Sequence, residues 1–181
     1  MNQLKLRNYQ AKTFQAVAEQ IIAKKNTLVQ IPTGGGKTIV GTKLIMELTK
    51  LGVAYWFMCH RKELVEQTSK TLTKFGISHG VIASGQPENL NRLVQVCSVD
   101  TLRNRLYEPS SNRPAGKLQH VIMWDECHHI AAASWQKVYN HYKDARHIGL
   151  SATPNRRDSK GLGDFFDEII TLDSIVGGNA V

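Results

Sequence analysis

Residues 30–38 read Gln-Ile-Pro-Thr-Gly-Gly-Gly-Lys-Thr, between a strand-like run over 27–31 and a helical pattern that begins at Ile39. Glycine suits such a loop because the chain must take backbone angles that side chains disfavour and bring its N–H groups close to an anion. The N-terminus of the following helix adds partial positive charge at the same place. The stretch therefore predicts a phosphate-binding loop between a strand and a helix.

The loop residues have distinct expected roles. Lys37 is expected to reach the β- and γ-phosphates of a nucleoside triphosphate, and Thr38 to offer its hydroxyl to Mg²⁺. The alternative is a glycine-rich turn without a ligand, which Gly-Lys-Thr at a helix start argues against. One departure is Ile31, because the full pattern has Gly or Ala at that position. The expected nucleotide-binding residues of the loop are Thr33, Gly34, Gly35, Gly36, Lys37 and Thr38.

The composition is that of a globular protein. The chain has 181 residues, 41% of them hydrophobic and 21% charged, enough to bury the core of one large domain or two small ones. No apolar run approaches the roughly 20 residues of a membrane helix. The N-terminus has no apolar signal region, so a cytoplasmic location is expected. The three cysteines are far apart and odd in number, which excludes a complete disulfide framework.

The charge favours a polyanionic partner. The formal net charge is +8 at pH 7, and nucleic acid is the commonest partner of such proteins. The alternative is a merely basic surface, since the lysines and arginines are spread along the chain.

Helical and strand patterns alternate along the chain. This alternation predicts a three-layer α/β domain with a mainly parallel central sheet. Residues 176–181 are expected to be a linker or chain end. The expected helices are 9–25, 39–51, 62–75 and 134–142, and the expected strands are 27–31, 53–58, 80–83, 93–97, 121–124, 147–150 and 168–172.

An apolar run over 121–124 ends in two acidic residues, Asp125 and Glu126. The carboxyl ends of parallel strands face the ligand crevice, so Asp125 is expected to project toward the Mg²⁺ held by Thr38. Glu126 is the candidate to orient or deprotonate the attacking water. The alternative is a pair of helix-capping acids, which the upstream phosphate loop disfavours. The expected catalytic residues are thus Glu126, Asp125 and Lys37.

Six segments, in order, resemble the motifs of superfamily 2 helicases. The form Asp-Glu-Cys-His-His at 125–129 is more similar to the branch with type III restriction helicase subunits and DNA-repair helicases than to the RNA-remodelling branch. The resemblance implies a RecA-like domain that binds and hydrolyses ATP. The matching segments are 6–10 (Q-motif), 32–38 (motif I), 60–67 (motif Ia), 96–102 (motif Ic), 125–129 (motif II) and 151–154 (motif III).

The Q-like segment implies a contact with the base. The carboxamide of Gln10 can donate to and accept from the edge of adenine, a fit that guanine does not offer. Arg7 or Tyr9 could stack on the base, although Tyr9 could equally pack as part of a helix cap.

The other motifs imply coupling and nucleic-acid contacts. The resemblance makes His128, Ser151 and Thr153 the residues that couple hydrolysis to nucleic acid, while His129 could be only a helix-start residue. Arg61 and Thr101 are expected to contact the nucleic-acid backbone without reading sequence, the alternative being exposed polar side chains.

Residues 1–175 are accordingly expected to be the first RecA-like domain, the ATP-binding half of a nucleic-acid helicase or translocase, with DNA favoured over RNA as the substrate. The second RecA-like domain, which supplies arginine fingers in this family, is expected elsewhere in a longer chain, so this part alone should hydrolyse ATP poorly. The alternative is a nucleotide-gated DNA-binding subunit of a restriction or nuclease complex that does not unwind. A P-loop kinase is disfavoured because the segments at 6–10 and 151–154 would have no role there. Restriction or repair subunits are the further partners that the resemblance implies.

Overall fold

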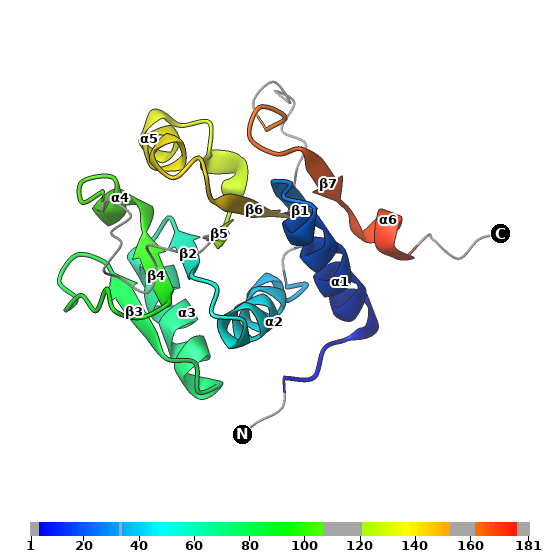
Figure 1. Ribbon diagram of the computed structural model, residues 1–181, viewed down its shortest axis with the longest axis horizontal. Helices are drawn as coiled ribbons and strands as arrows, with labels where there is room; N and C mark the ends of the chain where they lie inside the picture. The colour runs from blue at the N-terminus through cyan, green and yellow to red at the C-terminus, as the bar shows by residue number, and fades with distance from the viewer. Residues whose placement is uncertain (1–3, 33, 107–120, 153–161, 177–181) are drawn as a thin grey trace.

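The computed structural model describes residues 4–32, 34–106, 121–152 and 162–176 (Figure 1). Their strands form one sheet in the order β3-β4-β2-β5-β6-β1-β7, and every pair of neighbours is parallel. The strands are β1 Thr27–Gln30, β2 Tyr55–Cys59, β3 His79–Ile82, β4 Val94–Ser98, β5 Val121–Trp124, β6 Arg146–Ser151 and β7 Glu168–Ile170.

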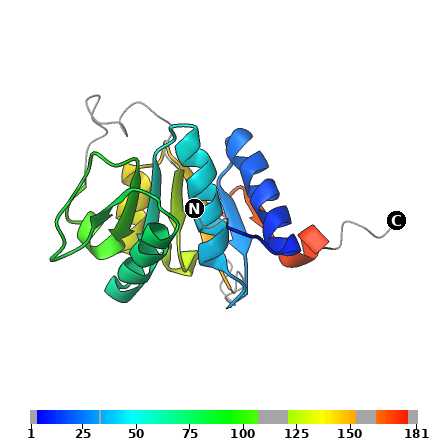
Figure 2. The ribbon, with the colours of Figure 1, turned by 90° about the horizontal axis from the view of Figure 1, so that it is seen from below.

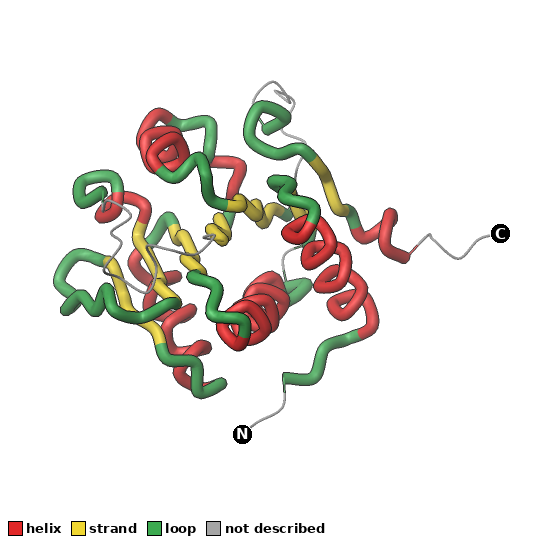
Figure 3. Tube along the Cα trace, in the orientation of Figure 1, coloured by secondary structure: helices red, strands yellow, loops and turns green. Residues whose placement is uncertain are grey.

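Helices cover both faces of this sheet, which confirms the predicted three-layer α/β fold. Figures 1 and 2 show α1, α2 and α3 side by side on one face, and α5 lies on the other (strands yellow and helices red in Figure 3). The helices are α1 Asn8–Ile22, α2 Lys37–Lys50, α3 Lys62–Lys74, α4 Val99–Leu102, α5 Ala133–His141 and α6 Leu172–Val176, with a 3-10 helix η2 at Cys127–His129.

Two apolar clusters fill the spaces between the layers. Alternate residues of a strand point to opposite faces, so Phe57 of β2 joins the cluster under α1–α3, whereas Trp56 and Met58 join the cluster under α4 and α5. All five residues of β2 are buried. This double burial is why the strand reads as a continuous apolar run in the sequence.

Several predicted element ends differ from the structure by one to three residues, and two of these differences have a clear local cause. The strand expected over 168–172 ends at Ile170, and helix α6 begins at Leu172. Thr171 stops the strand because its hydroxyl accepts the backbone N–H of Ser174 at 3.1 Å, as a helix cap does. The helix expected over 9–25 ends at Ile22, because Lys24 takes a left-handed backbone angle of φ 60°.

The carboxyl ends of the parallel strands meet at one edge of the sheet. The phosphate loop follows β1, His60 follows β2, Asp125 follows β5, and Ser151 ends β6. In α/β folds this is the edge where ligands bind.

Candidate nucleotide-binding site

The glycine loop is tightly packed. Gly36 has φ +80° and caps the N-terminus of α2, and a Cβ at this position would lie 2.4 Å from Nε2 of Gln10. A Cβ at Gly35 would lie 2.7 Å from Cγ2 of Ile31. Glycine is therefore required at both positions, and Lys37 and Thr38 occupy the first helical turn, whose N–H groups have no partner within the helix. Thr33 lies outside the described residues.

Lys37 and Glu126 form an ion pair that joins the loop to the end of β5. Their side chains are only 14% and 27% exposed. The other carboxylate oxygen of Glu126 lies 3.3 Å from Nδ1 of His128. Partial burial by itself would raise the pKa of Glu126, but the hydrogen bond and the charge of Lys37 outweigh it, so the pKa is lower than usual.

Glu126 also has an unusual backbone. Its φ of 52° and ψ of 49° lie in the left-handed region, which costs a residue with a Cβ about 1–2 kcal/mol. The chain turns here from β5 directly into η2. Strained conformations of this kind are often found where the protein must hold a functional side chain.

Asp125 is mostly buried beside this pair. Burial raises its pKa, and the positive charge of Lys37 opposes that rise. Asp125 and Thr38 line the same pocket, whose volume is about 660 Å³. Within the described ranges no three or more His, Cys, Asp or Glu side chains are grouped as metal ligands. A partly buried carboxylate and a hydroxyl nevertheless fit Mg²⁺, which commonly takes one or two protein ligands and completes its shell with phosphate oxygens and water.

Three histidines line the same pocket. The rings of His128 and His129 are 4.1 Å apart, and those of His60 and His129 are 5.3 Å apart. Burial and the neighbouring His129 lower the pKa of His60. Sequence reasoning placed His60 in the motif Ia segment and considered His129 as a helix-start residue, but it did not predict that either would line this pocket. The position of His60 directly after a buried strand could have indicated it.

The Q-like segment packs against the other side of the loop. Gln10 is only 5% exposed, and its Oε1 accepts the backbone N–H of Arg7 at 2.9 Å. Its Nε2 lies 3.3 Å from the carbonyl oxygen of Gly35, to which the Tyr9 hydroxyl also donates at 2.8 Å. Tyr9 is thus bonded to the loop, a contact that agrees with the packing alternative, while stacking on a base stays a prediction.

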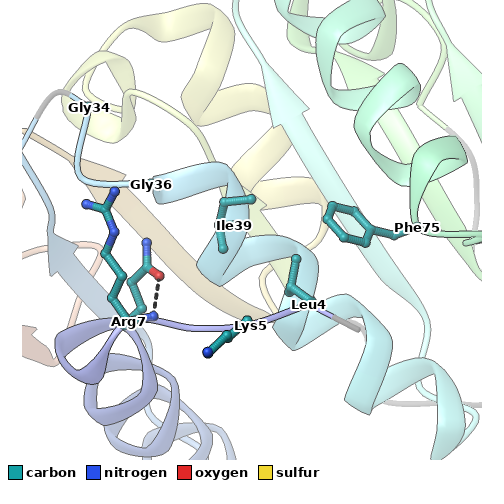
Figure 4. Close-up of a pocket in the computed structure, with 8 residues that line it drawn as sticks. Leu4, Lys5, Arg7, Gly34, Gly36, Ile39 and Phe75 are labelled. Carbon is teal, nitrogen blue, oxygen red and sulfur yellow. Dashed lines mark hydrogen bonds between the residues drawn. The ribbon is translucent and has the colours of Figure 1, made fainter. Parts of the chain in front are cut away.

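A second cavity, of about 380 Å³, adjoins the loop (Figure 4). The Arg7 side chain extends toward the loop between Gly34 and Gly36, and Phe75 closes the far side. The volume and mixed lining suit a nucleotide base. Leu4, Lys5 and Phe75 were not predicted here. The cavity is lined by Leu4, Lys5, Arg7, Gln10, Gly34, Gly36, Ile39 and Phe75.

The remaining predicted residues lie in different surroundings. Ser151 is fully buried, and its carbonyl accepts the N–H of Ile31 at 3.0 Å. Arg61 is exposed and lines the 660 Å³ pocket. Thr101 is 9% exposed, and its hydroxyl accepts the N–H of Ser84 at 3.1 Å, so its phosphate contact stays a prediction. Thr153 lies outside the described residues.

Two features define the class of RecA-like nucleotide-binding domains. They are a glycine-rich phosphate loop and a strand followed by acidic residues, both at the same edge of a parallel sheet. Residues 3–156 match the family model described as "Type III restriction enzyme, res subunit". The chain belongs to this family.

Curated relatives and solved structures agree with this assignment. The chain is 32% identical over 143 residues to a 51.5 kDa protein of a Lactococcus phage, covering 79% of the chain and 27% of the relative. It is 30% identical over 182 residues to the Saccharomyces cerevisiae protein IRC3, named as an ATP-dependent helicase, covering 91% and 26%. It is 26% identical over 160 residues to the DNA 3'-5' translocase XPB2 of Sulfurisphaera tokodaii, covering 88% and 33%.

The fold is that of the UvsW helicase of bacteriophage T4, with a TM-score of 0.70 at 18% identity over 91% of the chain and 59% of that structure. The predicted resemblance to superfamily 2 helicases is confirmed. The chain spans a third or less of the length of the three curated relatives.

Proposed function

We propose that residues 1–175 are the ATP-binding half of an ATP-dependent DNA helicase or translocase. The observation that carries the proposal is the Lys37–Glu126 pair, which closes the phosphate loop onto the acidic end of β5 inside one pocket with Thr38 and Asp125. The names of IRC3 and XPB2 support ATP as the nucleotide, and that of XPB2 favours DNA.

The pair also supports a mechanism. Lys37 moves from Glu126 to the β- and γ-phosphates of bound ATP, and the carboxylate of Glu126 is released within reach of His128. Loss of the neighbouring cation raises the pKa of Glu126, which makes it a better base for the attacking water. Mg²⁺, held by Thr38 and Asp125, would neutralise phosphate charge when bound. Gly34, Gly35 and Gly36 supply backbone N–H groups to the phosphates.

The pocket needs a second wall. Charge on the transferred phosphoryl group calls for a cation opposite Lys37, and an arginine in that place is worth about 10³–10⁵ in rate in related systems. We infer that a second RecA-like domain supplies it. His128, Ser151 and Thr153 would pass the state of the nucleotide to DNA, which Arg61 and Thr101 contact through phosphates.

The family description favours a second candidate. A subunit of a restriction complex could bind DNA under nucleotide control without unwinding it. Restriction or repair subunits are accordingly the further partners that we propose.

The free cysteines favour a reducing compartment. Cys59, Cys97 and Cys127 are all free and buried, and on that basis we propose the cytoplasm. No helix within the described ranges has the length and apolarity needed to span a bilayer.

ATP binding and turnover by the variant Glu126→Gln test the proposal. The test uses the full-length protein, because turnover needs the second wall of the pocket. We expect wild type to bind and hydrolyse Mg²⁺–ATP, and Glu126→Gln to keep binding and lose turnover, because the phosphate contacts remain while water activation fails. The control Glu47→Gln removes an acid from the exposed side of α2 and should behave as wild type. Absence of ATP binding by the wild type, or normal turnover by Glu126→Gln, would overturn the assignment.

A further inference from the structure

A pair of contacts ties the N-terminal helix to the phosphate loop. Tyr9 and Gln10, in the first turn of α1, both bond the carbonyl oxygen of Gly35, at 2.8 Å and 3.3 Å. We propose that Tyr9 and Gln10 are positioning residues that fix the Gly35–Gly36 peptide, so that the N–H of Gly36 faces the phosphates of the nucleotide. The inference rests on the proposed function and assigns the Q-like segment a task beyond contact with a base.

The geometry of the peptide unit carries the argument. In a trans peptide the C=O and the N–H point in opposite directions. A Gly35 carbonyl held against α1 therefore directs the N–H of Gly36 away from α1. That N–H belongs to the residue that caps the N-terminus of α2, where the field favours an anion.

The loop needs such a restraint because three glycines follow one another. Glycine takes positive and negative φ about equally well, so an unrestrained run can rotate its peptide units and lose the array of N–H donors. Gly34 has φ +77° and Gly36 has φ +80°. These two residues flank the peptide units whose orientation must be kept for the N–H groups to face the phosphates. A loop already held in its binding conformation loses less entropy when the nucleotide binds.

Packing on both sides of the loop agrees with this role. Gly35 is wedged against Ile31 on the strand side, and Gly36 against the Gln10 amide on the helix side. The loop is thus held between β1 and α1, and Tyr9 supplies the shortest of the polar contacts across that boundary.

The state of Gln10 separates this role from base reading. Its carbonyl group accepts from Arg7 N–H and its amide group donates to Gly35, so both groups that would read adenine already have protein partners. A residue that acts on the loop affects every nucleotide with a β-phosphate. A residue that reads the base affects discrimination between bases.

Calorimetric binding of Mg²⁺–ATP, Mg²⁺–GTP and Mg²⁺–tripolyphosphate tests the proposal, because tripolyphosphate has no base. The variant Tyr9→Phe deletes only the hydroxyl. We expect it to weaken binding of ATP and of tripolyphosphate alike, by roughly 3- to 10-fold, the usual effect of one lost hydrogen bond. The ratio of ATP to GTP affinity should stay within about twofold of wild type.

Two further variants complete the design. Tyr55→Phe makes the same chemical change in the core, where the hydroxyl lies 3.0 Å from the sulfur of Met123, and should leave all three affinities unchanged. Gln10→Met keeps the length of the side chain without its donor. Like Tyr9→Phe, it should weaken the binding of both ATP and tripolyphosphate. If Tyr9→Phe does not fold, Gln10→Met provides the test.

The outcomes are distinct. Weaker ATP binding with unchanged tripolyphosphate binding would make Tyr9 a base contact and overturn the proposal. Affinities that all stay within twofold of wild type, even with a lower melting temperature, would reduce the contact to a structural one and also overturn it. A wild type that binds neither ATP nor tripolyphosphate would instead overturn the proposed function itself.

Discussion

Replacing Lys37 by methionine should remove the ATP response of the protein and destabilise its empty form. Methionine keeps the aliphatic stem but lacks the charge that pairs with Glu126. Hydrogen bonds to charged groups are worth about 1.5–3 kcal/mol, and both side chains are less than a third exposed, so we expect a loss of that order without nucleotide. In a domain of this size, 1 kcal/mol shifts the melting temperature by about 2–4 °C.

The nucleotide effect is separate from this loss. ATP–Mg²⁺ at ~100 times its dissociation constant should stabilise wild type by about 2.7 kcal/mol, which thermal unfolding with and without ATP would detect. Lys37→Met should show no such shift. The control Lys43→Ala breaks a pair within one helix, worth about 0.3–0.5 kcal/mol, and should keep the full ATP shift. An unchanged ATP shift in Lys37→Met would refute the reasoning, because the phosphates would not depend on the lysine.

Three further predictions follow from local contacts. Gly149→Ala should lower the free energy of unfolding, measured by urea titration, by roughly 1–3 kcal/mol, because its Cβ would lie 2.7 Å from Sγ of Cys127. Gly163→Ala should leave it unchanged, because a Cβ there meets nothing within 4 Å. Burial lowers the pKa of His147 from 6.5 to about 4, so its contribution to stability is complete above pH 6.5 and is lost as the pH falls toward 4. The loss is on the order of 3 kcal/mol, and His147→Asn should flatten that part of the stability–pH curve. Arg61→Ala should reduce the slope of log K for single-stranded DNA against log salt by about 1, and an unchanged slope would remove Arg61 from the DNA surface.

Much of the fold was predictable because local patterns determine it. The strand over 121–124 is buried on both faces and bounded by two acids, and the structure has the same limits. The phosphate loop lies between β1 and α2 as predicted, because glycine and the helix start are local signals. The predicted end of β7 was wrong because the apolar Leu172 continues the strand pattern, and that pattern outweighed the local capping signal of Thr171, whose hydroxyl accepts the N–H of Ser174 three residues on.

The assembly of the site depends on strand order, which local periodicity does not encode. Lys37 and Glu126 are 89 residues apart and meet because β5 and β1 both flank β6. The bond from Tyr9 to Gly35 depends on how α1 packs against the loop. The position of His60 in the pocket depends on β2 being the neighbour of β5 in the sheet. Sequence reasoning therefore predicted that Thr38 and Asp125 share one site, but it did not predict the Lys37–Glu126 pair or the bond from Tyr9 to the loop.

The sheet order supports the coupling role that we propose for Ser151. β6 lies between β1 and β5, so its carboxyl end separates the phosphate loop from the acidic pair. The ion pair of Lys37 with Glu126 crosses over that end, and the carbonyl of Ser151 is bonded to Ile31 at the base of the loop. In this ion pair the charge of the proposed base, Glu126, is neutralised by the proposed phosphate ligand, Lys37, so neither group is available for its proposed role while the pair persists. On the proposed mechanism ATP breaks the pair when it binds, and the carboxyl end of β6 lies between the two strands whose ends carry the pair. We therefore expect Glu126 to act as a base only when the nucleotide is bound. This change would take place next to β6, the strand that ends at Ser151 in the expected coupling motif.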